Sequence, residues 1–202
     1  LSLPDSDDWS LGNGDFTLEC WVRWNVVGST DLFGQNLDSQ NKLVFYYENY
    51  KPHLSFYCRT SSGVFLSLYV ADNSFTPQAG EWYHLAAVRD GDYVYLFANG
   101  IKVASNSGGS FTFGDLSAPL QIGQTDGYYH HGWIDEVRVS KGIARWTENF
   151  TPPASAHHFD SFTKLLLHCD GQDGSVEFKD DVMAPYSVYT APFTISEDGR
   201  YI

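Results

Sequence analysis

Short runs in which apolar and polar residues alternate follow one another along most of the chain, whereas the spacing of an amphipathic helix is hard to find. These runs predict β-strands at residues 16–24, 42–48, 53–60, 64–70, 82–89, 93–98, 101–105, 120–123 and 133–140. Asn99-Gly100 between two of the runs is typical of a type I′ hairpin turn, and Asp90-Gly91-Asp92 indicates another tight turn. Many short strands joined by tight turns predict an all-β fold of two packed antiparallel sheets, a sandwich or jelly roll.

The size and charge of the chain narrow the range of functions that it can have. With 202 residues, 43% of them apolar and 16% aromatic, the chain can bury one sizeable core rich in rings. No stretch approaches the roughly 20 apolar residues of a membrane span, and a first residue other than Met suggests a fragment or a processed chain. A net charge of -13 argues against nucleic acid and anionic membranes as partners, because the protein's field repels both. Neutral glycans, cations and basic proteins remain.

The three cysteines have neither an even number nor the spacing of metal ligands. Each alternates in step with apolar neighbours, as Cys20 does with Leu18 and Val22. We therefore expect Cys20, Cys58 and Cys169 to be small core side chains.

Several segments together resemble a known family. DFTLECWVRW (15–24), GEWYHLAAVRDGDYVYLFANGIKVA (80–104), LQIG (120–123) and GWIDEVRVSKGIARWTENFTPP (132–153) follow the order found in laminin-G-like, concanavalin-A-like jelly-roll domains. The ending resembles the version repeated in bacteriophage tail and bacterial surface proteins. The resemblance covers residues 1–153, which we interpret as one domain, and it implies the antiparallel two-sheet jelly-roll sandwich of that family.

Residues 154–202 need a separate interpretation. Within them, FTKLLLHCDGQDGSVEFKDD (162–181) resembles the opening strands of another such domain, and the chain itself starts without those strands. We interpret this segment as a linker plus the opening strands of the repeat. These strands either complete their own domain or complete a neighbouring copy, which would make the protein a fibre-forming unit.

Two adjacent acids lie inside the predicted strand 133–140. Strict alternation places Asp135 on one face with Trp133 and Val137, and Glu136 on the other face with Arg138. A glycosidase requires two facing carboxyls about 5 to 9.5 Å apart, which neighbours on opposite faces cannot supply. The chain also has no nucleotide-binding, zinc-protease or serine-hydrolase motif. We therefore predict that the protein is not an enzyme.

Asp135 is the candidate metal ligand. A carboxylate beside Trp133 and Val137 must be paired, hydrogen-bonded or bound to a cation. The family resemblance implies a calcium ion near a rim of the sandwich, held by carboxylates and backbone carbonyls, so calcium is the expected cofactor if there is one. The acid-rich stretches 5–8 and 170–173 either contribute oxygens or are solvated turns.

Two aromatic segments are candidate sugar-binding loops. Residues 126–132 combine glycines with flat rings and polar tips, and residues 46–50 hold three tyrosines where a strand leaves its sheet. Aromatic rings can stack on the apolar face of a sugar while polar groups hold its hydroxyls. The candidate ligand-binding residues are Tyr47, Tyr50, Tyr128, Tyr129, His130 and His131. The alternative is that the tyrosines line a sheet face or a contact between subunits.

These observations favour a non-catalytic binding and assembly module. We interpret the chain as one repeat of an extracellular or virion surface adhesin, which binds neutral surface glycan through its loops and contacts other copies of itself. The alternative is a purely structural subunit of an extracellular filament or virion that polymerises by strand complementation.

Overall fold

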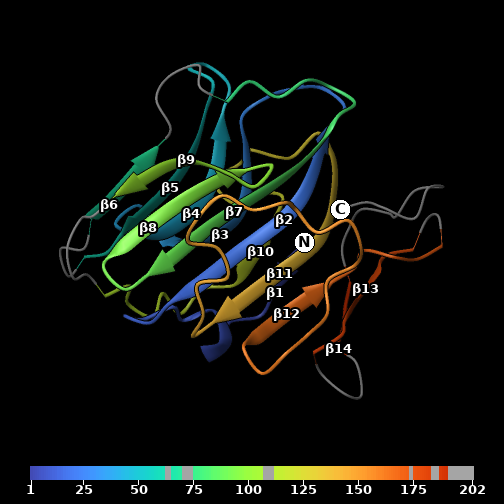
Figure 1. The fold of residues 1–202 in the computed structure, drawn as a ribbon. Coiled ribbons are helices and arrows are strands. Elements are labelled where there is room, and N and C mark those ends of the chain that lie inside the picture. Colours follow the sequence, from blue (N-terminus) through green and yellow to red (C-terminus); the bar gives the residue numbers. More distant parts are fainter. Residues whose placement is uncertain (62–64, 70–74, 107–111, 173–174, 183–186, 191–202) are drawn as a thin grey trace.

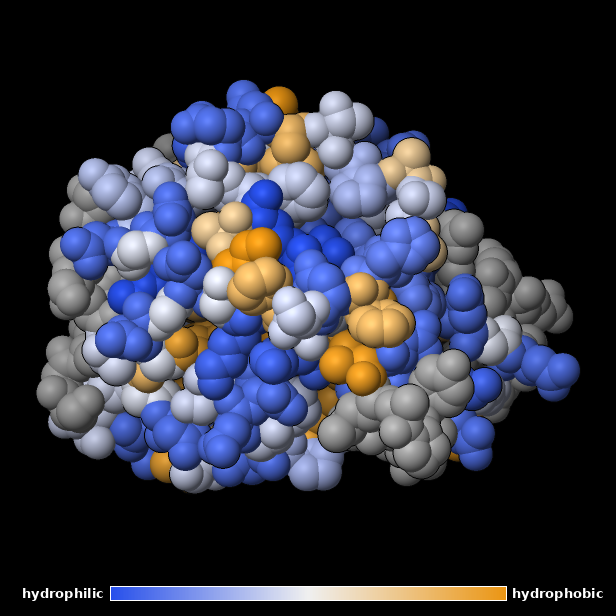
Figure 2. Space-filling view, turned by 60° about the horizontal axis from the view of Figure 1, so that its bottom comes forward, coloured by the Kyte–Doolittle hydropathy of each residue, from blue (hydrophilic) through white to orange (hydrophobic). Residues whose placement is uncertain are grey.

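A computed structural model describes residues 1–61, 65–69, 75–106, 112–172, 175–182 and 187–190. Two six-stranded antiparallel sheets pack face to face (Figure 1), so the predicted jelly-roll sandwich is confirmed. None of the helices in the described part of the chain has the length and hydrophobicity that a membrane crossing requires. On the face shown in Figure 2, hydrophilic residues dominate and apolar ones form small separate patches.

The first sheet has the strand order β1-β10-β3-β4-β5-β6. Its strands are β1 (Ser2–Leu3), β10 (Leu120–Ile122), β3 (Thr30–Asp38), β4 (Asn41–Glu48), β5 (His53–Arg59) and β6 (Phe65–Tyr69). The ends of the predicted strand 64–70 lie outside the described residues. Strand β3 is absent from the prediction because register shifts between Asp31 and Phe33 and between Asn36 and Asp38 interrupt its alternation.

The second sheet has the order β12-β11-β2-β7-β8-β9. Its strands are β12 (Thr163–Leu167), β11 (Gly132–Lys141), β2 (Phe16–Trp24), β7 (Trp82–Asp90), β8 (Tyr93–Ala98) and β9 (Ile101–Asn106). Asn99 (φ 48°) and Gly100 (φ 74°), between β8 and β9, both have the positive φ of a type I′ turn. Strands β13 (Glu177–Asp180) and β14 (Ser187–Thr190) form a separate two-stranded sheet.

The tail of the chain contributes a strand to this sheet. β12 pairs antiparallel with β11 of the same chain, with Leu167 opposite Val137 and Leu165 opposite Val139. All four side chains are fully buried. The assignment of 1–153 and 154–202 as domain and repeat, and the supply of strands to a neighbouring copy, stay predictions.

The core fills the space between the sheets with inward residues of both. Phe16 of β2 packs on Phe56 of β5 at 5.8 Å between ring centroids, and Trp24 packs edge-on against Tyr47 at 5.4 Å. Each fully buried large side chain contributes about 1.5–3 kcal/mol relative to exposure. The three cysteines are buried and free and belong to this core, which confirms the sequence prediction.

A bulge in β11 corrects the prediction for the two acids. Pairing with β2 skips between Asp135 and Arg138, and Glu136 has a φ of 50°. As a result Ile134 and Val137 both face the core, so Asp135 lies on the outer face with Trp133 as predicted, but its predicted shared face with Val137 was wrong. The argument that the acids point in opposite directions also fails, since both line one hollow on the outer surface.

Residues 142–158, which we call the strap, lie across the outer face of the second sheet (Figure 1). Trp146 and Phe150 of the strap stack at 3.9 Å, and Phe150 packs edge-on against Phe97 of β8 at 5.4 Å. A Cβ at Gly100 would lie 1.9 Å from the Phe150 carbonyl oxygen, so only glycine permits this approach. The strap therefore buries the apolar outward residues of β7 and β8.

Candidate functional site

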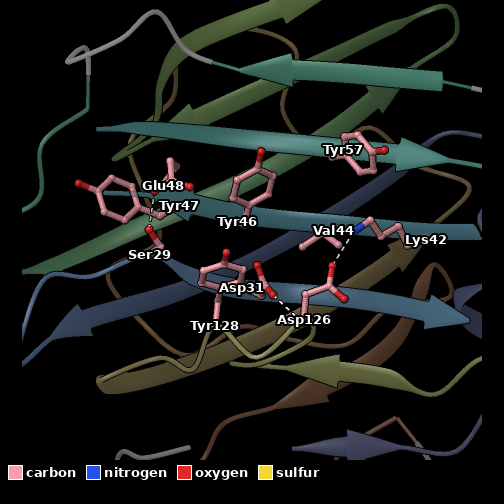
Figure 3. A pocket seen from close by; sticks show the side chains of 10 residues that line it. All are labelled: Ser29, Asp31, Lys42, Val44, Tyr46, Tyr47, Glu48, Tyr57, Asp126 and Tyr128. Atoms are coloured by element: carbon pink, nitrogen blue, oxygen red, sulfur yellow. Dashed lines mark hydrogen bonds and ion pairs between the residues drawn. The ribbon is translucent and has the colours of Figure 1, made fainter. Parts of the chain in front are cut away.

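A cavity of about 270 Å³ opens on the outer face of the first sheet (Figure 3). Alternation in β4 sends Leu43 and Phe45 into the core, which leaves Lys42, Val44 and Tyr46 facing outward. Four tyrosines line the cavity, so we call it the tyrosine cavity; they are Tyr46, Tyr47, Tyr57 and Tyr128. Figure 3 shows the Tyr46 and Tyr57 side chains on neighbouring strands and Tyr128 reaching toward them from the loop that follows β10.

That loop rests directly on β3. A Cβ at Gly34 would lie 2.0 Å from Thr125 Oγ1 and 2.7 Å from Thr125 Cβ, so only glycine leaves room for the loop. The backbone nitrogen of Asp126 donates to Asp31 Oδ2 at 2.9 Å, and the nitrogen of Asp31 donates to the carbonyl of Tyr128 at 3.1 Å. These contacts fix Asp126 and Tyr128 at the cavity.

The charges of the cavity are arranged in pairs. Lys42 Nζ lies 2.6 Å from Asp126 Oδ2, and this hydrogen bond raises the pKa of Lys42. Asp31 is 4% exposed, and its burial, followed by the nearby Asp126 charge, raises its pKa to about 6. Glu48 accepts from Ser29 Oγ at 2.6 Å and from the Tyr50 nitrogen at 2.9 Å. The cavity thus offers several oriented acceptors, one paired cation and aromatic rings.

The tyrosines predicted as ligand contacts separate into two groups. Tyr128, which is 53% exposed, lines the tyrosine cavity, and so does Tyr47. Tyr47 is only 1% exposed, because its ring packs against Trp24 and Phe75 in the core. Tyr50 and Tyr129 are exposed and do not line the cavity.

The two histidines of the loop also differ. His130 turns inward: its ring packs edge-on against Trp24 at 5.4 Å, and Nε2 lies 3.3 and 3.2 Å from the carbonyl oxygens of Arg23 and Trp133. Burial lowers the pKa of His130 to about 4. His131 is exposed and outside the cavity lining. A role in ligand binding stays a prediction for all six residues that the sequence proposed: Tyr47, Tyr50, Tyr128, Tyr129, His130 and His131.

Sequence reasoning missed Tyr57, Asp31 and Lys42 as candidate site residues. Strand alternation could have identified Lys42 and Tyr57. In KLVFYYE and HLSFYCR, the residues between the core positions face outward. The two strands are adjacent, and Val44 pairs with Tyr57. Asp31 had no comparable signal, since the irregular strand that carries it was not predicted.

A buried ion cluster lies on the outer face of the second sheet beneath the strap. Glu19 of β2 is fully buried and accepts from Arg138 Nε at 2.7 Å and Trp146 Nε1 at 3.0 Å, and His84 Nε2 lies 3.1 Å from its carboxylate. Burial opposes ionisation, but the His84 hydrogen bond and the Arg138 charge hold the pKa of Glu19 at about 2. His84 alternates along β7 with Ala86 and Val88 and is buried with them.

His157 of the strap completes a set of potential metal ligands. One atom from each of Glu19, His84 and His157 lies within 4.8 Å of the others, and this is the one such group of three or more His, Cys, Asp or Glu in the described residues. Arg138 already forms an ion pair with the Glu19 carboxylate, and its positive charge opposes the binding of a second cation there. The cluster therefore fits a structural role, which fastens the strap to the sheet.

The neighbours of Asp135 do not converge as calcium ligands do. Its Oδ1 accepts from the Glu136 nitrogen at 2.9 Å, while Glu136 is bonded to His168 Nδ1 at 2.8 Å and to the His157 nitrogen at 2.6 Å. Within the described ranges, Asp135 belongs to no group of three or more potential ligands, whereas calcium takes about six to eight oxygens. Calcium at Asp135 stays a prediction that this geometry does not support.

Comparison with known proteins places this geometry in a family. A family model described as the concanavalin A-like lectin/glucanases superfamily matches residues 1–148. The chain belongs to this superfamily. The superfamily joins binding proteins and enzymes, so membership alone does not assign an activity. No curated protein sequence matches the chain.

Solved structures share the superfamily fold at low sequence identity. A candidate carbohydrate-binding protein from Bacteroides ovatus has a TM-score of 0.66 and 17% identity over 92% of this chain, which spans 56% of that protein. Domain 4 of an extracellular arabinanase from Geobacillus stearothermophilus, in complex with arabinotriose, has a TM-score of 0.55 and 20% identity, with 71% of this chain and 66% of that one covered. Domains LG4-5 of the mouse laminin α1 chain have a TM-score of 0.51 and 12% identity, with 75% and 43% covered.

Proposed function

We propose that the protein is a non-catalytic carbohydrate-binding module whose ligand site is the tyrosine cavity. The observation that carries this proposal is the outward set Tyr46, Tyr57 and Tyr128 beside oriented acceptors on Asp126 and Glu48. Aromatic rings offer apolar faces for a sugar ring, and a few fixed polar groups give hydroxyl recognition. The arabinotriose complex of the arabinanase domain supports the same use of this fold.

The charges of the cavity favour a neutral glycan. Asp31, Glu48 and Asp126 line it, against one cation, Lys42, which is already paired with Asp126. With the net charge of -13, this arrangement repels sugars that bear carboxylates or sulfates. The same field disfavours nucleic acid and anionic membranes as partners.

Hydrolysis is the second candidate function, because the raised pKa of Asp31 is what a general acid requires. Against it, Asp31 is nearly inaccessible and accepts a backbone hydrogen bond, and both Lys42 and Asn36 donate to Asp126. We therefore expect a bound oligosaccharide to remain intact during long incubation, checked by release of reducing ends. Release that Asp31→Asn abolishes would instead establish an enzyme.

We further propose that the module is one repeat of an adhesin on a cell or virion surface, with a structural filament subunit as the alternative. Light scattering of the full chain and of a chain ending at Pro153 separates them, because β12 covers the edge of β11. A monomeric full chain and an aggregating truncated one support the adhesin. A full chain that polymerises while the truncated one stays monomeric supports strand donation, and repeating both with a calcium chelator tests the predicted cofactor.

The binding site is tested by a glycan array followed by calorimetry on the best neutral ligand. Tyr57→Ala removes a ring from the cavity, whereas Tyr50→Ala removes a ring that is 89% exposed and outside it. We expect Tyr57→Ala to weaken binding about tenfold or more, or 1.4 kcal/mol, and Tyr50→Ala to bind as the unchanged protein does. Equal effects of the two substitutions would contradict the proposed site.

A further inference from the structure

A second hollow, of about 700 Å³, lies on the opposite side of the sandwich, where the strap leaves the outer face of the second sheet uncovered. Trp21 of β2 and Trp82 of β7 line it from the sheet, and Pro152 and Ser155 of the strap line it from the side. Asp170, after β12, also lines it. The hollow shares no lining residue with the tyrosine cavity.

The register of the strands holds the two tryptophans on the outer face. Trp21 pairs with Asp135 of β11 and with His84 of β7, and Trp82 pairs with Arg23. Trp21 contacts His84 edge-on at 5.4 Å between ring centroids. Both tryptophans are half-buried, in contrast to the fully buried Trp24 of the core.

Two hydrogen bonds fix the wall that the strap provides. The Phe150 nitrogen donates to the carbonyl of Gly100 at 2.9 Å, and the Lys102 nitrogen donates to Asn149 Oδ1 at 2.8 Å. Pro152, two residues after Phe150, can rotate little about its own φ. The hollow is therefore bounded by fixed backbone, as a preformed ligand site requires.

The ionisable residues that line this hollow are all acids: Asp135, Glu136 and Asp170. Glu136 is bonded to His168 and to the His157 nitrogen, whereas Asp170 is exposed. Arg23, directly opposite Trp82, lies 4.6 Å from the Trp133 ring centroid and donates to the Gly80 carbonyl, so its guanidinium is held by groups outside the hollow lining. Aromatic faces beside carboxylates are the arrangement that attracts an organic cation.

We propose that this hollow binds a glycan whose sugar units carry free amino groups. The apolar ring faces of the sugar lie against Trp21 and Trp82, and the ammonium groups lie near Asp135 and Asp170. This proposal extends the proposed carbohydrate-binding function to a second site with a different selectivity. Two sites on opposite faces of one module would allow it to bridge two glycan chains and to gain avidity.

The test compares two probes with one backbone: an oligosaccharide of glucosamine and its fully N-acetylated counterpart, titrated at a pH where the amine is protonated. We expect the glucosamine oligomer to bind about tenfold or more tightly than the acetylated one, as an ion pair supported by a ring predicts. Trp82→Ala and Asp170→Asn should each remove most of that preference. Tyr50→Ala, which removes an exposed ring outside both cavities, should leave it unchanged.

Three results would overturn the proposal: equal affinity for the two probes, no binding of either, or a preference that survives in both Trp82→Ala and Asp170→Asn. Asp170 is exposed, so its substitution is not expected to disturb folding. Neutral-glycan binding that Tyr128→Ala abolishes reports separately on the tyrosine cavity, so this proposal can fail while the proposed function stands.

Discussion

The two outer faces of the sandwich are built from similar strands, but different segments cover them and to different extents. On the first sheet a short loop touches β3 and leaves the outward side chains of β4 and β5 around an open cavity. On the second sheet the strap covers the outward side chains of β7 and β8 and encloses the carboxylate of Glu19. An outward acid on the covered face must be satisfied within the protein, whereas one on the open face can also meet a ligand. We therefore expect the ion cluster to stabilise the fold and propose that the open cavity binds the ligand.

The largest effect should follow from removing the acid of the covered face. Glu19→Ala leaves Arg138, which is 6% exposed, without its carboxylate beneath the strap. Breaking a buried pair in this way costs about 3–5 kcal/mol, measured as the free energy of unfolding in urea. Glu148→Ala is the matched control, because Glu148 pairs with Lys102 at a side chain that is 87% exposed, and such surface pairs contribute about 0–1 kcal/mol. Similar losses in the two variants would show that the cluster does not hold the strap.

Lowering the pH should reduce the stability of the protein at both outer faces, because each has a buried histidine that is neutral in the folded state. Burial lowers the pKa of His157 in the strap and of His130 in the loop from 6.5 to about 4. A lowered folded-state pKa contributes stability that is fully present above pH 6.5 and is lost as the pH falls toward 4, by about 2–3 kcal/mol per histidine. We expect His157→Leu to remove roughly half of this pH dependence and the exposed His158→Leu to remove none, as followed by melting temperature against pH. An unchanged slope in His157→Leu would contradict the burial of a neutral ring.

The loop on the open face can be displaced without changing any cavity side chain. In Gly34→Ala the new methyl group meets Thr125, so the loop that carries Asp126 and Tyr128 must shift. We expect a loss of about 1–3 kcal/mol in stability, together with weaker glycan binding. Gly14→Ala, where a Cβ meets nothing within 4 Å, should change neither property. Full affinity in Gly34→Ala would show that the position of the loop is unimportant for binding.

The smallest effect should come from the ion pair at the edge of the open cavity. Lys42 and Asp126 have side chains that are both 25% exposed, and ion pairs that solvent can reach contribute less than about 1 kcal/mol. Lys42→Met should therefore leave chemical unfolding nearly unchanged. A loss as large as that of Glu19→Ala would erase the distinction between the two faces.

The sequence was sufficient to predict the strands in which the alternation of core and outward residues is unbroken. Strands 16–24 and 93–98 have the predicted bounds, because core residues occupy every second position in each. It was insufficient where the backbone departs from a period of two. The bulge at Glu136 placed Asp135 and Val137 on opposite faces, and the register shifts in β3 hid the strand that carries Asp31.

The site depends on contacts between segments distant in sequence, which alternation does not encode. Tyr128 reaches the cavity only because Gly34, more than ninety positions earlier, lets the loop approach β3. Glu19 gave no signal as a network residue, since its partners Arg138 and Trp146 come from the other end of the chain. A single sequence predicted the sandwich and drew attention to the loop that carries Tyr128, but it did not predict how this loop packs on β3.

The most direct test of the open cavity uses two neighbouring tyrosines. Tyr128 lines the cavity, and Tyr129 is 62% exposed outside it, so Tyr128→Ala and Tyr129→Ala remove the same side chain one position apart. Calorimetric titration with the neutral glycan should show a loss of about tenfold or more for Tyr128→Ala and unchanged affinity for Tyr129→Ala. The same affinity in both variants, or a greater loss in Tyr129→Ala, would contradict recognition by the open face.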